Sequence, residues 1–283
     1  MKKLIFLSAI LAISVFQINA QQLPLYSQYM LNGFLLNPGI TGSTENIPIR
    51  LTVRNQWTGI TDAPMTQAIS AHSKLPNKNM GIGGYVFNDS FGPISSTGVQ
   101  VSYAYHILVG TETNLGLGLS ISAFQFKLDE TELTSIEQDD LALSRAVEST
   151  FVPDANFGAY LYNEKYFAGI AGSQLIQYKV EIDGEQAGNN QMIRHYYLTG
   201  GYNFRLNDNF ILQPSLLAKG TERSPAQLDV NAKAVYKDNY WLAVSYRTSQ
   251  SAIAIVGIKY KRYYIGYAFD YAFSNLSNYS TGS

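Results

Sequence analysis

The stretch Tyr263–Phe273 reads YYIGYAFDYAF, and its residues alternate between two chemical classes. The odd positions carry tyrosine, isoleucine or phenylalanine, whereas the even positions after Tyr264 carry glycine, alanine or aspartate. A period of two residues is that of a β-strand whose two faces meet different surroundings. In a soluble sandwich the large apolar face would point into a core. In an outer-membrane barrel it would point to lipid, and the small face would point to the lumen.

The same alternation recurs along the chain, and no amphipathic helical period of comparable length accompanies it. Most of the alternating stretches have about the 9–11 residues of a tilted strand that crosses a bilayer, more than the roughly 5–6 of ordinary soluble strands. We predict strands at 49–57, 66–73, 80–88, 95–108, 113–126, 154–162, 165–175, 194–205, 209–219, 226–236, 239–248, 251–260 and 263–274.

The predicted connections alternate in length. Every second one is short, and those between them are mostly longer: the short ones are 74–79, 108–111, 163–164, 206–209, 237–239 and 261–262, the long ones 58–65, 88–94, 127–153 and 176–193. Outer-membrane barrels have short periplasmic turns and longer extracellular loops. The sequence therefore predicts an all-β, antiparallel transmembrane β-barrel with the Tyr263 face on lipid and the Gly266 face on the lumen.

The number of predicted strands is odd, whereas bacterial single-chain barrels have even numbers. Either the sequence lacks its last strand, or one strand escapes the pattern. We favour the first alternative and expect a barrel of about 14 strands whose last strand is missing. Its closing seam would then be open, which is costly in lipid because unpaired strand edges carry unsatisfied backbone groups.

The first residues indicate export. Residues 1–20 begin with two lysines before an apolar run and end on the small residue Ala20, which predicts a cleaved secretory signal peptide. A membrane anchor is the alternative, but the apolar run is short and two serines interrupt it. We therefore expect a signal peptide at 1–20, an N-terminal segment at 21–48 and an outer-membrane barrel at 49–283.

The composition agrees with an outer-membrane barrel and excludes some classes of partner. The chain has 21 tyrosines, 23 glycines and no cysteine, and its net charge is -1. Aromatic girdles are typical of outer-membrane barrels, although a secreted sandwich or propeller would share such a composition. The near-neutral charge predicts no nucleic-acid partner, and the absence of cysteine excludes a disulfide framework.

The segment at 21–48 lacks the alternation of the strands. It holds Pro24, Pro38, Gly39 and an apolar patch from Met30 to Leu36. This segment is too apolar for a solvated tail, so we expect it to pack in the lumen of the barrel or at its periplasmic mouth.

The chain offers little chemistry for catalysis. His72, His106 and His195 have no metal-ligand spacing, and the sequence has no Gly-x-Ser-x-Gly nucleophile elbow. His106 and His195 fall on polar strand faces, where we expect lumen hydrogen bonds rather than catalysis. The glycines of 81–84 indicate curvature or close packing in the lumen rather than phosphate binding. We therefore expect no enzyme and no cofactor, with an outer-membrane hydrolase as the open alternative.

Charged side chains gather in two kinds of place. The connection 127–153 is rich in acids, and it is either a solvated surface loop or a docking surface for a partner outside the cell. Polar strand faces carry further charged or amide groups, for which peptide binding and filtering of solutes are open alternatives; we expect them to pair with lumen acids such as Asp229 and Asp270. These groups are Arg50, Arg54, Gln56, Lys233 and Arg247.

Five phrases together resemble the PorP/SprF family. They stand in the family's order and extend over nearly the whole chain after the predicted signal peptide. They are QQLPLYSQYMLNGFLLNPGITGS at 21–43, VRNQWTGI at 53–60, NDSFGPISSTGVQVSYAYHI at 88–107, QPSLLAKG at 213–220 and LDVNAKAVYKDNYWLAVSYR at 228–247. Family members usually continue into one closing strand, and this sequence departs from them there.

The resemblance implies a function. The family is associated with the type IX secretion system and, in gliding bacteria, with export of surface adhesins; its members are outer-membrane barrels and not enzymes. It implies that the chain binds and anchors, or helps export, a secreted cargo protein through a C-terminal sorting domain. It also implies periplasmic contact with a lipoprotein or a peptidoglycan-binding component. An outer-membrane solute channel or transporter remains the main alternative.

The resemblance supplies no catalytic, cofactor or metal residues, but it indicates positions for a plug or a partner-binding surface. We expect the N-terminal segment to lie against the lumen-facing side of the first strand. The candidate positions are Tyr26, Ser27, Gln28, Tyr29, Asn37, Pro38, Arg54, Gln56 and Trp57.

Overall fold

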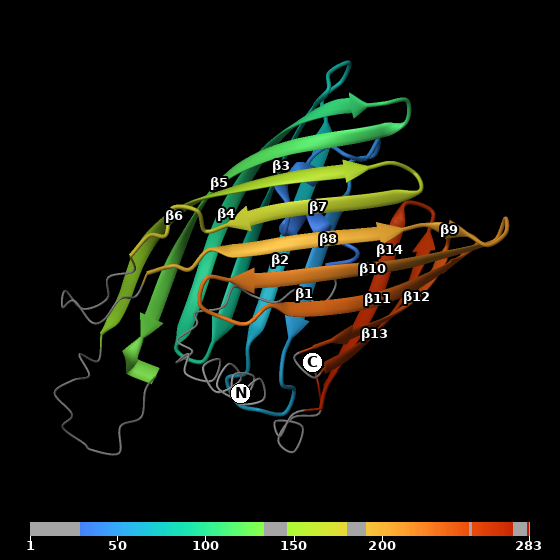
Figure 1. Cartoon of the computed structure of the whole chain (residues 1–283). Helices are drawn as coiled ribbons and strands as arrows, with labels where there is room; N and C mark the ends of the chain where they lie inside the picture. The colour runs from blue at the N-terminus through green and yellow to red at the C-terminus, as the bar shows by residue number, and fades with distance from the viewer. Residues whose placement is uncertain (1–28, 133–145, 180–190, 249–250, 274–281, 283) are drawn as a thin grey trace, which may run out of the picture.

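The computed structural model describes residues 29–132, 146–179, 191–248, 251–273 and 282. This part of the chain is all-β, with fourteen strands in one sheet whose neighbours are all antiparallel (Figure 1). The strands are β1 (Ile49–Asn55), β2 (Met65–Lys74), β3 (Met80–Phe91), β4 (Ile94–Val109), β5 (Thr113–Asp129), β6 (Val147–Tyr162), β7 (Tyr166–Ser173), β8 (His195–Tyr202), β9 (Phe204–Arg205), β10 (Phe210–Thr221), β11 (Gln227–Tyr236), β12 (Tyr240–Arg247), β13 (Ser251–Tyr260) and β14 (Tyr263–Ala272).

Three short 3-10 helices accompany the sheet. These are η1 (Gly33–Leu35), η2 (Pro38–Ile40) and η3 (Glu130–Glu132). Among the described residues, no helix has the length and apolar character needed to cross a membrane.

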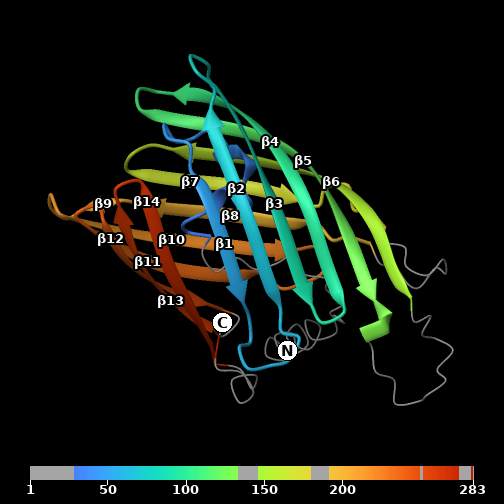
Figure 2. The ribbon, with the colours of Figure 1, turned by 180° about the vertical axis from the view of Figure 1, so that it is seen from behind.

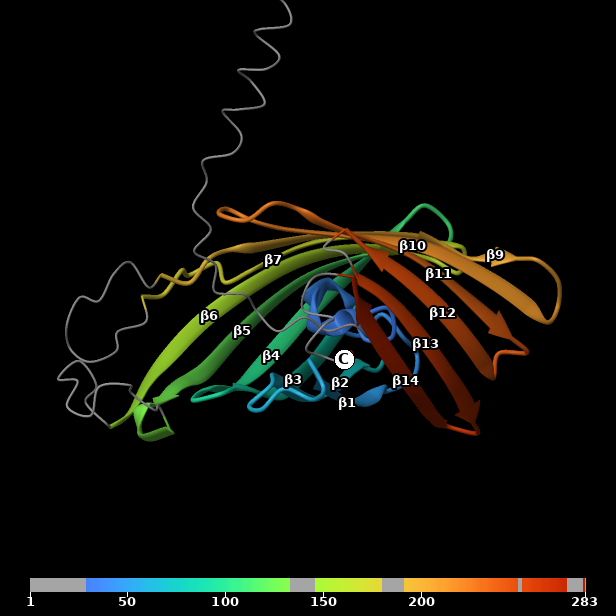
Figure 3. The same cartoon turned by 90° about the horizontal axis from the view of Figure 1, so that it is seen from below.

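The strands follow one another in sequence order around a strongly curved sheet, which encloses an interior that we call the lumen (Figure 3). Strands β1 and β14 stand at the two ends of this order, and no ladder joins them in the described part of the chain. They nevertheless lie on the same side of the molecule (Figure 2), and the side chains of Arg54 on β1 and Asp270 on β14 form an ion pair of 2.9 Å. We call this unpaired junction the seam.

The alternation of the sequence matches the two faces of the sheet, with the apolar face outward. On β14 the side chain of Tyr267 is 67% exposed, whereas Asp270 is only 7% exposed and faces the lumen. On β4 the valines and tyrosines at odd positions are exposed, and Gln100, Ser102 and His106 are buried. The prediction that the Tyr263 face points outward and the opposite face inward is confirmed.

The thirteen predicted strands correspond to the observed ones, with differences at their ends. The predicted strand 194–205 is interrupted at Asn203, and its last two residues form the separate strand β9. The fourteenth strand is therefore this short piece beside β10 and not a closing strand, because β1 and β14 end the order among the described residues.

Two connections differ from prediction. The expected loop 88–94 is a tight turn of two residues, because β3 continues to Phe91 and β4 begins at Ile94. Gly92 has a φ of +52° there, which glycine adopts without steric cost. The expected loop 127–153 is shorter too, since β5 extends to Asp129 and β6 begins at Val147.

Candidate functional site

A segment that we call the plug, residues 29–44, lies inside the curved sheet (Figure 3). It contains η1 and η2, and its first residues pack on the wall formed by β12 and β13. Met30 and Leu31 contact a buried cluster of small and branched side chains there, which includes Ile253 and Ile255. The expectation that the apolar patch packs in the lumen agrees with this position.

Phe34 anchors the middle of the plug. It is 1% exposed, and its ring lies 5.0 Å from the ring of His72 and 6.1 Å from that of Tyr85, measured between centroids. The contact with Tyr85 is edge-to-face, a favoured arrangement of aromatic pairs. Two residues earlier, the Asn32 amide donates a hydrogen bond of 3.0 Å to the hydroxyl of Ser70 on β2.

Asn37 fixes the plug to two strands at once. Its Oδ1 accepts a hydrogen bond from the backbone N–H of Gly39 and so caps η2. Its Nδ2 donates to the backbone carbonyl oxygens of Ala159 on β6 and Ile170 on β7, at 3.0 and 3.3 Å. Pro38 at the first position of η2 has no N–H to satisfy, which suits a helix start.

The plug rests on a floor of glycines. Pro38 and Gly39 approach Gly116 and Gly118 on β5 and Gly158 on β6. A Cβ added at Gly118 would collide with the backbone of Pro38, and one added at Gly158 would collide with the side chain of Asn37. Only glycine permits this close approach of two backbones.

Two histidines hold the end of the plug. His106 donates from Nε2 to the carbonyl oxygen of Thr41 at 2.8 Å, and its Nδ1 lies 3.1 Å from the hydroxyl of Tyr162. His72 accepts at Nδ1 from the backbone N–H of Gly42 at 3.1 Å. Beside them, Gly81 meets the backbone of Thr41 so closely that a Cβ would clash, which confirms close lumen packing at this glycine.

Tyr29 starts the plug next to a buried ion pair. Its hydroxyl donates to Oδ1 of Asn231 at 2.9 Å. Burial raises the pKa of the Tyr29 phenol above its usual range, and the negative charge of Asp229 adds to the effect. Asp229 itself is 0% exposed and accepts bidentate hydrogen bonds of 3.0–3.1 Å from Arg247, which is 4% exposed.

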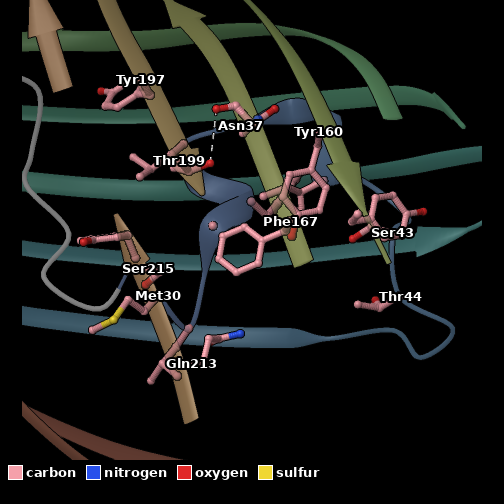
Figure 4. A pocket seen from close by; sticks show the side chains of 18 of the residues that line it. Met30, Asn37, Ser43, Thr44, Tyr160, Phe167, Tyr197, Thr199, Gln213 and Ser215 are labelled. Carbon is pink, nitrogen blue, oxygen red and sulfur yellow. Dashed lines mark hydrogen bonds between the residues drawn. The ribbon is translucent and has the colours of Figure 1, made fainter. Parts of the chain in front are cut away.

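A cavity of about 320 Å³ remains between the plug and the wall (Figure 4). The rings of Tyr160 and Phe167 lie 6.2 Å apart on one side of it. Asn163 and Asn203 also line it, and they belong to or adjoin the short turns, so the cavity extends to the short-turn end of the sheet. Arg50 and Lys233 are its only lining side chains with a permanent charge among the described residues.

The structure divides the candidate positions into two groups. Tyr29, Asn37 and Pro38 lie together in the plug, whereas Arg54 lies at the seam and Gln56 and Trp57 follow β1. The Trp57 ring packs edge-on to that of Phe91, with centroids 6.0 Å apart. Residues 26–28 lie outside the described residues.

The plug uses other strands than the one we expected. Its hydrogen bonds reach β2 through Ser70 and His72, β4 through His106, and β6 and β7 through the carbonyls that bind Asn37. Helix η2 contacts β4 to β7. Sequence reasoning foresaw a lumen position for the plug, a lumen hydrogen bond for His106 and close packing at the glycines of 81–84. It did not connect these residues with the plug, and it missed the glycines of β5 and β6, for which the alternate glycines at 116–118 were the available signal.

The lumen charges divide into paired and unpaired groups. Arg54 pairs with Asp270 and Arg247 with Asp229, as predicted. The predicted pairing is wrong for Arg50 and Lys233, which have no acidic partner within the described part of the chain.

His195 also makes a lumen hydrogen bond. It is fully buried, and its Nδ1 donates to the carbonyl oxygen of Ile193 at 2.9 Å. The described residues contain no group of three histidine, cysteine, aspartate or glutamate side chains that could hold a metal ion.

Comparison with known protein families finds a match over most of the chain. The model of the family described as type IX secretion system membrane protein PorP/SprF matches residues 18–283. This range includes the plug, the cavity and all fourteen strands. A search of curated proteins finds no match.

Proposed function

Because the chain belongs to the PorP/SprF family of type IX secretion system membrane proteins, we propose that it is an outer-membrane component of that system which binds an exported protein. In this role the curved sheet crosses the outer membrane with many strands. The short turns face the periplasm, and the long connections face the cell exterior, where they engage the C-terminal sorting domain of the cargo. The cargo is then anchored at the surface or helped through export.

The outward face of the sheet supports the membrane position. Large apolar side chains such as Ile121, Leu119 and Tyr246 are more than half exposed along it, and exposed apolar surface of this extent requires lipid or a partner. The polar positions face the lumen instead, which is the arrangement of an outer-membrane barrel.

The position of the plug in the lumen is the observation that favours a role in binding over a role as a channel. Its contacts with the wall include hydrogen bonds through Asn37, Thr41 and Gly42, and its backbone lies in close contact with the glycines of β5 and β6. A lumen crossed by a fixed segment favours a binding scaffold over an open channel. The proposed activity is therefore recognition without turnover, and the surface for it is at the long-connection end.

The test is a pulldown of the tagged, full-length protein from its native outer membrane in mild detergent, followed by mass spectrometry. One variant replaces residues 133–145 in the acidic connection by a short Gly-Ser linker. The matched control inserts the same linker into the short turn 237–239, at the opposite end of the sheet. We expect a large exported protein with a C-terminal sorting domain to co-purify, and its yield to fall in the first variant only.

A solute channel would give different results. The protein would then be recovered without exported cargo and would conduct ions or small solutes in planar bilayers. Conductance together with the absence of cargo would contradict the proposed role.

A further inference from the structure

We propose that the cavity between the plug and the wall binds a carboxylate carried on an apolar or aromatic body, which enters from the short-turn end. This proposal is argued from the residues that line the cavity, and it does not depend on the proposed role in secretion. The cavity combines an excess of positive charge, aromatic walls and a size within the range of ligand sites, and each property is argued separately below.

The charge of the lining is positive. Arg50 comes from β1 and Lys233 from β11, and no aspartate or glutamate lines the cavity among the described residues. The contrast with Arg247 is direct, because that guanidinium has Asp229 within 3.1 Å. Cations withdrawn from bulk water without a counter-charge are costly, and a ligand carboxylate would offset that cost through charge-assisted hydrogen bonds.

The walls between the charges are largely apolar. Tyr160, Phe167 and Tyr197 present aromatic rings to the cavity, and Leu36 and Ile40 contribute aliphatic surface from the plug. Figure 4 shows the rings of Tyr160 and Phe167 next to each other beside the plug. A small inorganic anion would leave these walls in contact with water, so the lining fits an anion with an apolar body.

Most of the neutral polar groups already have partners. The amide of Gln213 donates to Oδ1 of Asn203, the hydroxyl of Thr199 donates to the carbonyl of Gly169, and Asn37 is engaged with β6 and β7. The cations are therefore the strongest donors left for a ligand. The volume of about 320 Å³ lies near the lower end of the roughly 300–1,000 Å³ of small-molecule pockets.

The experiment is isothermal titration calorimetry on the full chain in detergent micelles at pH 7 and low salt. The probes are N-acetylphenylalanine, the peptide acetyl-Ala-Ala-Phe, and the C-terminal amide of that peptide. We expect the two carboxylates to bind, and the amide to bind at least about tenfold more weakly. Tighter binding of the peptide acid would identify a peptide carboxyl terminus as the source of the carboxylate, and tighter binding of N-acetylphenylalanine would identify a free small acid.

Matched variants locate the binding. Lys233→Gln and Arg50→Gln should each weaken carboxylate binding at least about tenfold. The controls Lys165→Gln and Arg205→Gln remove exposed cations near the same end of the sheet, outside the cavity lining, and should leave the affinity unchanged. Retention of heat-modifiable mobility in electrophoresis would verify that each variant is folded. Equal affinity for acid and amide, no binding at millimolar probe, or equal effects of cavity and control variants would overturn the proposal.

Discussion

Two parts of the lumen wall hold the plug by different means. On β5 and β6 the inward positions next to η2 are glycines, and the backbone of Pro38 and Gly39 lies directly on them. On β11 and β12 the inward positions include the polar or charged residues Asp229, Asn231 and Arg247, and the plug meets them through the hydrogen bond of Tyr29 to Asn231, next to the pair of Asp229 with Arg247. The same alternating pattern thus holds the plug by close backbone packing on β5 and β6, which we call the steric seat, and by polar and charged side chains on β11 and β12, which we call the electrostatic side. The residue type at the inward positions determines which of the two kinds of contact forms.

The largest effect is expected on the electrostatic side. Asp229→Asn leaves the guanidinium of Arg247 buried without a counter-charge, and removing one partner of a buried pair costs about 3–5 kcal/mol. The measurement is denaturant unfolding of the folded protein in detergent. The double variant Asp229→Leu with Arg247→Met should recover most of the loss, since apolar replacement of both partners is often neutral.

A matched control is the exposed pair of Arg194 and Glu222. Glu222→Gln should change the unfolding free energy by about 1 kcal/mol or less. Equal losses in Glu222→Gln and Asp229→Asn would mean that the lumen pair is as well solvated as a surface pair.

The steric seat should respond next. Gly118→Val places a branched side chain where the backbone of Pro38 lies, and such overpacking costs about 2–3 kcal/mol. We also expect protease to cleave the plug in the folded protein. This cleavage distinguishes displacement of the plug from a general loss of stability. Gly220→Val on β10 is the control, because a Cβ there meets nothing within 4 Å; a control as damaging as Gly118→Val would remove the steric explanation.

Asn37→Ala tests the side-chain hydrogen bonds that fix η2 to β6 and β7. The substitution removes the cap of η2 and the hydrogen bonds to the carbonyl oxygens of Ala159 and Ile170. We expect the free energy of unfolding to fall by about 2 kcal/mol, because buried groups lose their hydrogen-bond partner. Asn46→Ala, at an exposed position just after the plug, should stay within about 0.5 kcal/mol of the parent. Unfolding curves of the two variants compare them directly, and a loss in both would assign the effect to the segment as a whole.

The seam gives the smallest expected change. Arg54→Gln removes the charge that faces Asp270, and loss of a charged hydrogen bond costs about 1.5 kcal/mol. Its control is Lys74→Gln, which breaks the more exposed pair with Glu45. A loss in Arg54→Gln as large as in Asp229→Asn would contradict this ranking and show that the seam pair contributes as much to stability as the fully buried pair.

Most of the sheet could be predicted from the sequence, because strand pairing follows a local pattern. The alternation in Tyr263–Phe273 identified both the strand and its outward face. The error at 88–94 has a local cause too: Phe91 and Ile94 continue the two strands, and Gly92 with Pro93 suffices for the turn. Strand ends depend on pairing with a neighbour, which a single-strand pattern does not contain.

The seat of the plug could be predicted only in part. The apolar patch Met30–Leu36 indicated that the segment is buried, but its partners are far away in the sequence. Asn37 contacts strands more than 120 residues later, and the position of His106 under Thr41 depends on the register of several strands. Such contacts follow from the assembled sheet and leave little trace in the sequence of the plug itself.

The place of the plug at the start of the chain also sets an order of events during assembly. Its residues emerge before any strand, yet its seat on β5 and β6 exists only after a long stretch of chain has paired into hairpins. Hairpins close short loops and form quickly, whereas contacts between distant segments are slow because they must first overcome the entropy of a long loop. We therefore expect the plug to dock late, so that a newly made chain carries an exposed apolar segment that needs protection until the sheet has curled around it.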